Sequence, residues 1–358
     1  MNPTRALHDL GQSLWLDNIT RELLEKGTLK RYIDELSVTG LTSNPTIFDQ
    51  AISKSALYDG DIRKLRASGL SGEALFFELA IQDLTRAADL FALIHRRTAG
   101  FDGFVSLEVS PLLAYETDKT LAQARELHRK AARPNLLIKI PGTPAGLPAI
   151  EEATFAGIPI NVTLLFSREQ YLAAANAHLR GLERRIQAGQ SPDVRSVASL
   201  FLSRWDVAVS KEVPAELRDR LGIAVGQQSY RAYRDLLESD RWQRLANAGA
   251  RPQRMLFAST GTKDPKASDV LYIRGLAAPN TINTMPEKTL LAFGDHGTID
   301  GTIPRDGGEA QQVLAAFGRA GFDLEQLAAR LQKEGAESFV ASWKDLMGAV
   351  ENKGKQLG

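Results

Sequence analysis

LLIKIPG, Leu136 to Gly142, places a lysine inside an apolar run that a proline and a glycine bring to an end. An apolar run of about four to eight residues closed by turn formers is typical of a buried strand in a parallel sheet. Lysine is rarely buried without a role. Lys139 either reaches solvent from the strand end or pairs with a carboxylate, or burial lowers its pKa by up to about 3 to 5 units and makes it a nucleophile toward a carbonyl carbon. This stretch alone favours neither interpretation.

The composition indicates an ordinary globular protein without a nucleic-acid footprint. The 358 residues are 43% hydrophobic and 24% charged, with a formal net charge of +1, which fits one large α/β domain or two modest ones. Lys/Arg runs are limited to short pairs such as Arg96–Arg97, so nucleic acid is not an expected partner. The absence of cysteine excludes disulfides and thiolate chemistry and is compatible with a reducing cytoplasm.

No apolar stretch approaches the roughly 20 residues that a membrane span requires, and the N-terminal MNPTRALHDLGQ lacks the apolar centre of a signal peptide. We therefore expect a cytoplasmic protein without membrane contact.

Eight short strand-like runs are predicted, nearly all separated by helical patterns. They are Ser13–Ile19, Ser37–Pro45, Phe104–Pro111, Leu136–Gly142, Pro159–Ser167, Val194–Asp206, Arg254–Pro265 and Asp269–Leu276. This alternation over this length favours an α/β fold, a single (β/α)₈ TIM barrel with additional helices. A doubly wound open sheet also fits the alternation, but its glycine-rich phosphate fingerprint is missing after the first strand. Residues 1–358 are expected to form one domain, with C-terminal helices at about 308–352 packed on the barrel.

Side-chain alternation along these runs places polar residues on one face near the C-terminal strand ends. Lys139 shares its face with Leu137, while Leu136, Ile138 and Ile140 share the other. The polar residues that the other runs bring to this end are Asp17, Thr42, Asn44, Ser106, Glu108, Asn161, Thr163, Ser199 and Ser259. Parallel barrel strands bring these ends to one mouth, where barrel enzymes carry out their chemistry.

Each of these polar residues also has a structural interpretation. Asp17 alone could be the N-cap of the following helix, and Asn44 before a proline could be a plain turn residue. Seven strands place polar residues at the same end, around one buried lysine, and this common arrangement favours a catalytic role for Lys139.

The segments GLTSNPTIF, VSLEV, LIKIPGT, INVTLLFS and ASLFLSRWD, in this order and at these spacings, closely resemble bacterial transaldolases. The resemblance extends from Asp17 to the eighth predicted strand. It implies a cofactor-free class I aldolase-type barrel of the pentose phosphate pathway, which transfers a dihydroxyacetone unit from a ketose phosphate to an aldose phosphate. DHGTIDGTI near the C-terminus resembles the longer bacterial branch of these enzymes. Many bacterial relatives are dimers, so the resemblance also suggests a homodimer.

The resemblance assigns roles to individual residues. Lys139 becomes the Schiff-base lysine and Asp17 the base for the C4 hydroxyl. Glu108, with Thr163 and a water molecule, handles protons as the carbinolamine forms and dehydrates. The residues that match sugar-binding positions are Thr42, Asn44, Ser106, Asn161 and Ser199.

The resemblance also predicts a phosphate site. Arg204 matches the phosphate-binding arginine, although it could instead pair with Asp206. Many relatives carry a second arginine soon after the serine that matches Ser259. This chain has AST-GTKDP there, so Lys263 is expected to supply that positive charge. A lysine ammonium is a point charge and lacks the planar pair of N–H donors of an arginine.

Two other functions remain open. A fructose-6-phosphate aldolase-like enzyme shares the lysine and the fold, but it carries glutamine and tyrosine where this chain has Glu108 and Phe201, so transfer is favoured. A catalytically silent sugar-phosphate-binding barrel is the other alternative. None of the five histidines lies at a predicted strand end, so no metal site is expected.

Overall fold

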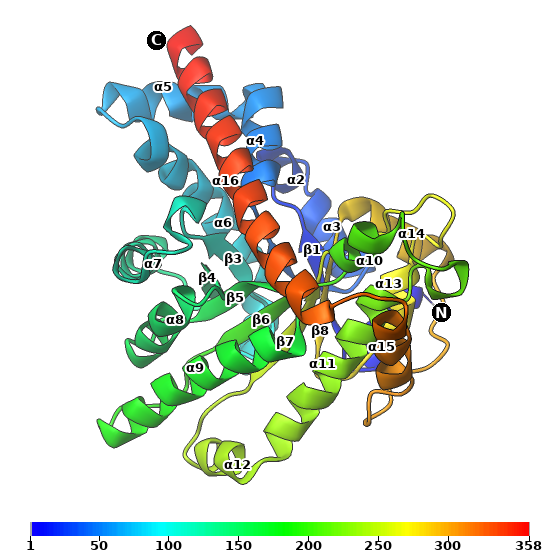
Figure 1. The fold of residues 1–358 in the computed structure, drawn as a ribbon. Coiled ribbons are helices and arrows are strands. Elements are labelled where there is room, and N and C mark those ends of the chain that lie inside the picture. The colour runs from blue at the N-terminus through cyan, green and yellow to red at the C-terminus, as the bar shows by residue number, and fades with distance from the viewer. Residues whose placement is uncertain (1, 358) are drawn as a thin grey trace.

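The computed structural model describes residues 2–357 and contains a closed barrel of parallel strands in chain order. Figure 1 shows the strands at the centre with helices around them. The strands are β1 (Ser13–Asp17), β2 (Val38–Thr42), β3 (Val105–Glu108), β4 (Leu136–Pro141), β5 (Ile160–Leu165), β6 (Ser196–Phe201), β7 (Gln253–Ala258) and β8 (Ile282–Met285). The predicted (β/α)₈ barrel is confirmed.

The strand register aligns the polar residues that alternation had grouped. Lys139 is level with Glu108 on β3 and with Asn161 on β5. Asp17 at the end of β1 is level with Thr42 at the end of β2. The C-terminal strand ends therefore present these side chains together, as the pattern predicted.

The predicted eighth strand is wrong. The run Asp269–Leu276 forms a short helix, α13 (Leu271–Gly275), and β8 follows at Ile282–Met285. Val270, Ile273 and Leu276 are all buried, at the three-residue spacing of a helix face. The β-branched Val270 and Ile273 and the aromatic Tyr272 give this run a strand-like composition, while the true strand has only four residues.

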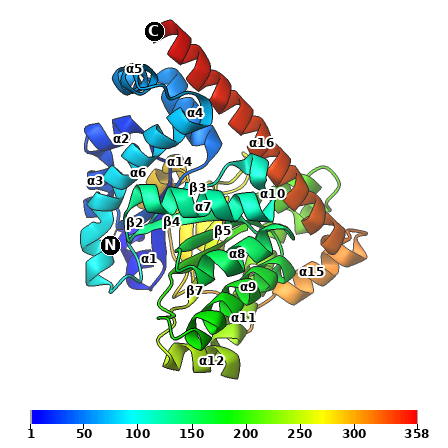
Figure 2. The ribbon, with the colours of Figure 1, turned by 90° about the vertical axis from the view of Figure 1, so that its left-hand side faces the viewer.

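Helices surround the barrel on all sides (Figure 2). They are α1 (Pro3–Asp9), α2 (Arg21–Glu25), α3 (Thr28–Glu35), α4 (Pro45–Lys54), α5 (Asp59–Ala67), α6 (Gly72–Arg97), α7 (Thr117–Ala131), α8 (Gly146–Phe155), α9 (Arg168–Gln187), α10 (Ser203–Val209), α11 (Leu221–Glu238), α12 (Asp240–Asn247), α14 (Glu287–His296), α15 (Ala310–Arg319) and α16 (Leu324–Leu357), with short 3₁₀ turns η1 (Ala56–Tyr58), η2 (Pro111–Leu113) and η3 (Ala215–Leu217). Within residues 2–357, none of the helices combines the length and apolar character that crossing a bilayer requires.

The long helix α16 connects distant parts of the molecule. Both ribbon views show it running from beside α15 to α5 along one side of the barrel. On the way it packs against α4, α6 and β5. Its side chain Gln332 donates to the main-chain carbonyls of Gly142 (3.1 Å) and Leu164 (2.9 Å), which lie at the C-terminal ends of β4 and β5. The helix therefore crosses the edge of the barrel mouth.

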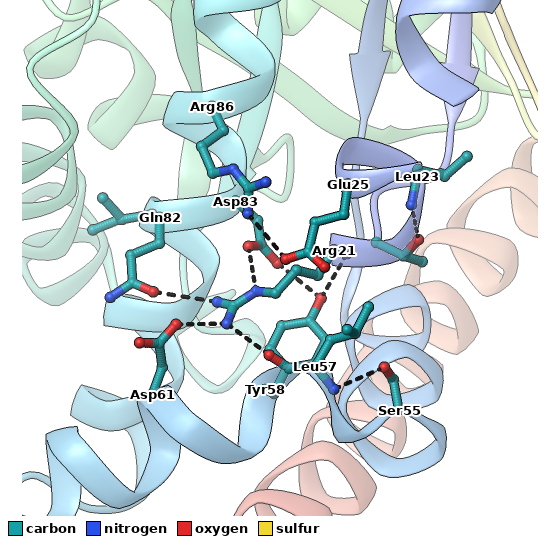
Figure 3. A network of polar contacts seen from close by, with 12 residues as sticks. Arg21, Leu23, Glu25, Ser55, Leu57, Tyr58, Asp61, Gln82, Asp83 and Arg86 are labelled. Carbon is teal, nitrogen blue, oxygen red and sulfur yellow. Dashed lines mark hydrogen bonds and ion pairs between the residues drawn. The ribbon is translucent and has the colours of Figure 1, made fainter. Parts of the chain in front are cut away.

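A buried arginine joins the N-terminal helices to the barrel's helical layer (Figure 3). The Arg21 guanidinium donates to Asp83 at 3.0 Å, Asp61 at 2.6 Å and Gln82 at 3.2 Å. Tyr58 donates to the other carboxylate oxygen of Asp83 at 2.8 Å. Because these partners come from α5, η1 and α6, the network fixes the position of α2, which follows the strand that ends in the predicted catalytic aspartate.

Candidate active site

Lys139 lies inside the barrel mouth and does not reach bulk solvent, since only 4% of it is exposed. Its Nζ donates to the main-chain oxygen of Ser43 at 3.1 Å and lies 3.5 Å from Glu108 Oε2. The strand geometry predicted the burial, and the nearest carboxylate is the residue predicted to move protons. The interpretation in which Lys139 extends to solvent is wrong.

The amine faces a cavity of about 450 Å³ at the C-terminal ends of the strands. Eight further residues from the predicted set line it: Asp17, Thr42, Asn44, Ser199, Phe201, Arg204, Ser259 and Lys263. The other predicted residues, Ser106, Glu108, Asn161 and Thr163, are buried in the barrel interior. The cavity has room for a sugar phosphate, and the interior residues form the layer that supports the lysine.

Asp17 is held by a relay of hydroxyl groups. Thr42 Oγ1 donates to Asp17 Oδ1 at 2.7 Å, and Thr284 Oγ1 lies 2.7 Å from Thr42 Oγ1. Burial raises the pKa of Asp17, while the charges of Lys139 and Lys263 and the Thr42 hydrogen bond oppose that rise. Asp17 is not the cap of the next helix, because Thr20 caps α2. The carboxyl group therefore remains available to the cavity with a raised proton affinity.

Glu108 has a different environment. Burial raises its pKa, the ammonium of Lys139 lowers it and the charge of Asp17 raises it further. Its Oε1 and Thr163 Oγ1 are both buried, and neither has a hydrogen-bond partner within residues 2–357. Two carboxyl groups with distinct neighbours can take distinct proton-transfer roles.

A hydrogen-bonded chain of side chains runs behind the lysine. Ser199 Oγ donates to Asn161 Oδ1 at 2.7 Å, and Asn161 Nδ2 donates to Ser106 Oγ at 3.0 Å. Ser199 lines the cavity, whereas Asn161 and Ser106 are buried. The chain fixes the orientation of the Asn161 amide beside the strand that carries Lys139.

Asn44 caps a helix and also faces the cavity. Its Oδ1 accepts from the main-chain nitrogen of Ile47 at 3.1 Å and caps α4, with Pro45 in the first turn. The residue also lines the cavity. The cap fixes its Oδ1, which places the Asn44 amide at the cavity wall.

The cationic side of the cavity is formed by Arg204 and Lys263. Within residues 2–357, no carboxylate lies within 4.0 Å of the Arg204 guanidinium. Asp206 instead accepts from the main-chain nitrogens of Leu221 and Gly222 and from Tyr272. The alternative pairing of Arg204 with Asp206 is therefore wrong. Burial lowers the pKa of Arg204, although a guanidinium remains charged at neutral pH.

Ser259 lies next to this charge. Its Oγ is 2.9 Å from Ser203 Oγ, and its backbone has a left-handed φ of 54°. That conformation is uncommon for a residue with a side chain and often occurs at functional sites. Two cations and a serine hydroxyl together offer the donors that a phosphate group needs.

Several cavity residues were missed by the sequence analysis. They are Thr46, Ile47 and Gln50 on α4, Thr284 and Pro286 around β8, and Ser338 and Phe339 on α16. Thr284 was missed because the eighth strand was misplaced. Ile47 and Gln50 could have been found from the helical spacing after Asn44, whereas no local pattern marks the residues on α16.

Metal ligands are not grouped in this region. Among residues 2–357, no group of three or more His, Cys, Asp or Glu side chains is arranged to hold a metal ion. His178 is buried and lies 3.0 Å from Thr154 Oγ1, and His296 is exposed between Asp269 and Asp295. Neither histidine lines the cavity.

Comparison with known proteins identifies the family. Residues 14–350 match the model of the Transaldolase/Fructose-6-phosphate aldolase family. Proteins named transaldolase from Arthrobacter sp. (strain FB24) and Thermobifida fusca (strain YX) are each 44% identical to this chain over 358 residues. Both alignments cover 98% of this chain, together with 96% of the Arthrobacter protein and 97% of the Thermobifida protein. A transaldolase of Mycobacterium tuberculosis is 44% identical over 96% of this chain and 94% of its own length. The resemblance seen in the sequence motifs is confirmed, and the chain belongs to the transaldolase/fructose-6-phosphate aldolase family.

Proposed function

We propose that this enzyme, a transferase of the transaldolase type, works through a Schiff base on Lys139. It transfers a dihydroxyacetone unit from sedoheptulose 7-phosphate or fructose 6-phosphate to glyceraldehyde 3-phosphate or erythrose 4-phosphate. The observation that carries the proposal is a buried amine facing a cavity, with Glu108 at 3.5 Å and Asp17 in the cavity wall. The same cavity has two cations suited to the substrate phosphate.

The first half of the reaction joins substrate and enzyme. Unprotonated Lys139 attacks C2 of the ketose, and the resulting carbinolamine loses water to become an iminium ion. We assign the proton transfers in these steps to Glu108, together with the Thr163 hydroxyl and a water molecule. Glu108 suits this role because it lies beside Nζ and its Oε1 has no protein partner in the part of the chain described.

The second half breaks and remakes a carbon–carbon bond. Asp17 takes the proton of the C4 hydroxyl, the C3–C4 bond breaks, and its electrons move into the iminium to give an enamine. The aldose phosphate leaves as an aldehyde. The enamine carbon then attacks the aldehyde of the acceptor, Asp17 returns the proton to the new hydroxyl, and hydrolysis frees the product from Lys139. The raised pKa of Asp17 favours this exchange of protons.

Phosphate recognition is assigned to Arg204, Lys263 and Ser259. Arg204 can bind a phosphate through two parallel N–H groups, whereas Lys263 supplies a single charged donor. Thr42, Asn44, Ser106, Asn161, Ser199 and Phe201 are proposed to surround or support the sugar. Glu108 and Phe201 favour transfer over a fructose-6-phosphate aldolase-like reaction, which would release free dihydroxyacetone.

Covalent capture tests this assignment. Borohydride added together with fructose 6-phosphate should reduce the iminium and fix the adduct on Lys139, as located by peptide mass mapping. Lys139→Met removes the amine while keeping the apolar stem, so it should give no adduct. An unmodified Lys139 in the wild-type enzyme would favour the non-catalytic binding barrel, and rapid dihydroxyacetone release without an acceptor would favour the aldolase.

Three further assignments belong to the proposal. Residues 1–358 are taken as one domain because the barrel is continuous. The enzyme is taken as cytoplasmic, which the lack of cysteine supports. The assembly is taken as a homodimer on the basis of the resemblance to dimeric relatives. Light scattering after size exclusion should give about twice the chain mass of 39.2 kDa. A mass of one chain would contradict the dimer without affecting the catalytic assignment.

A further inference from the structure

Phe339, on the C-terminal helix α16, reaches the catalytic cavity. The side chain is 7% exposed and lines the cavity together with Lys139. Its ring centroid lies 5.9 Å from Lys139 Nζ and also 5.9 Å from the Arg204 guanidinium carbon. One ring therefore lies near both the proposed covalent site and the proposed phosphate-binding group.

The surroundings of Phe339 fix its position. Phe201 on β6 packs edge-on against it, with ring centroids 6.4 Å apart, and lies 5.4 Å from the Arg204 guanidinium carbon. One helical turn earlier, Gly335 leaves room for Arg204, because a Cβ built there would approach Nη1 to 3.2 Å. The face of α16 toward the mouth is thus shaped around Arg204 and Lys139.

A transferase of this kind must prevent a competing reaction. After C3–C4 cleavage, the three-carbon unit remains on Nζ as an enamine. Transfer occurs when its carbon attacks the acceptor aldehyde. Release occurs when that carbon takes a proton and water adds to C2, after which the C–N bond breaks to give dihydroxyacetone and the free amine. Exclusion of water and retention of the acceptor phosphate both favour transfer.

We propose that Phe339 is a specificity-determining residue that shields the intermediate on Lys139 from water and positions Arg204 for the acceptor phosphate, so that transfer prevails over hydrolytic release. An aromatic face near a cation also stabilises it electrostatically, which applies to both the iminium and the guanidinium. This inference rests on the proposed Schiff-base function and adds a determinant outside the barrel strands.

The test compares Phe339→Leu, which keeps an apolar side chain but loses the ring, with the wild-type enzyme. Trp343→Phe is the matched control. Trp343 lies one turn further along α16, is buried, and packs on Phe76 and Phe77 at 5.1 and 5.7 Å without lining the cavity. It therefore reports a general disturbance of the helix. Phe339→Met, which is similar in bulk and more adaptable, provides a second variant if the leucine variant does not fold.

Two measurements decide the outcome. The ratio of dihydroxyacetone release to transfer, with fructose 6-phosphate as donor and erythrose 4-phosphate as acceptor, should rise about tenfold in the Phe339 variants, equivalent to about 1.4 kcal/mol. The KM for glyceraldehyde 3-phosphate should also become more similar to the KM for glyceraldehyde, which lacks the phosphate. Trp343→Phe should change neither ratio.

A fall in turnover with an unchanged release-to-transfer ratio would refute the proposal and leave Phe339 as a packing residue. An equal change in the Trp343 control would also refute it. Borohydride capture in the wild-type enzyme distinguishes these results from a failure of the Schiff-base assignment, because capture on Lys139 does not depend on how the intermediate later partitions.

Discussion

Replacing Gln332 with leucine should weaken both the fold and the catalytic site. Gln332 is 8% exposed on α16, and its Nε2 donates to the main-chain oxygens of Gly142 and Leu164 at 3.1 and 2.9 Å. Gly142 follows Lys139 by three residues, and Leu164 directly follows Thr163. Leu164 has a left-handed φ of 58°, a conformation that costs roughly 1–2 kcal/mol for a residue with a side chain. The amide therefore holds two strand ends, one of which is strained.

The expected loss follows from these two hydrogen bonds. Each contributes a net stabilisation of about 0.5–1.5 kcal/mol, and an unsatisfied buried carbonyl adds a desolvation cost. We expect the free energy of unfolding of Gln332→Leu to fall by about 2–3 kcal/mol. The free energy of unfolding of Gln332→Glu should fall by at least as much, because a carboxylate would face the same two carbonyl oxygens.

Gln243→Leu is the matched control, since Gln243 is exposed on α12 and donates to the main-chain oxygen of Leu237 at 2.7 Å. Urea denaturation followed by tryptophan fluorescence should show a loss of about 0.5 kcal/mol or less for this surface change. The kcat of the Gln332 variants should also fall, because the ends of β4 and β5 loosen beside the amine. Equal losses for the two positions would refute the reasoning.

Three other outcomes can be measured. Asp17→Asn should still form the imine, detected by borohydride capture, while turnover falls by about 10²–10⁴-fold. Because burial raises the pKa of Asp17 in the folded state, ionisation of this carboxyl group destabilises the fold as the pH rises. At neutral pH, Asp17→Asn should therefore unfold at a higher urea concentration than the wild-type enzyme. Unfolding at a lower urea concentration would contradict this. Arg204→Lys should raise KM about tenfold for phosphorylated acceptors and little for glyceraldehyde, since it removes the two-pronged donor; equal effects on both would exclude a phosphate role. Burial lowers the pKa of His178 to about 3 in the folded state. Below its ordinary pKa of about 6.5, the imidazole therefore binds a proton in the unfolded chain and not in the folded one. The free energy of unfolding should decrease as the pH is lowered from about 6.5 to 3, by up to about 1.4 kcal/mol per pH unit. His178→Gln should make that fall shallower in acid denaturation, and an unchanged slope would contradict it.

Local pattern was enough to predict the barrel strands that carry Lys139 and the other candidate site residues on β1 to β7. The run around Lys139 was predicted because an ionisable residue interrupts an apolar strand. Alternation then grouped Glu108 and Asn161 at the same end of the barrel, and the strand register places both level with it. The eighth strand was mistaken because α13 has strand-like composition while β8 has only four residues. The contributions of Gln332 and Phe339 were not predictable, because they depend on how α16 crosses the barrel some 190 residues later in the chain.

In the proposed mechanism two carboxyl groups act on a substrate bound to one amine, and the order of the strands sets where each carboxyl group lies. Glu108 is on β3, directly beside the β4 strand of Lys139, whereas Asp17 is on β1, two strands further around the barrel. In the proposed mechanism, we therefore expect a substrate joined to Lys139 through C2 to meet Glu108 at the bond to nitrogen and to reach Asp17 at C4. On this assignment the two proton transfers take place on different strands. We expect the phosphate end to be bound by groups outside the first four strands, where Arg204, Lys263 and the α16 side chains line the cavity. The C-terminal helix therefore completes the cavity that the strands begin.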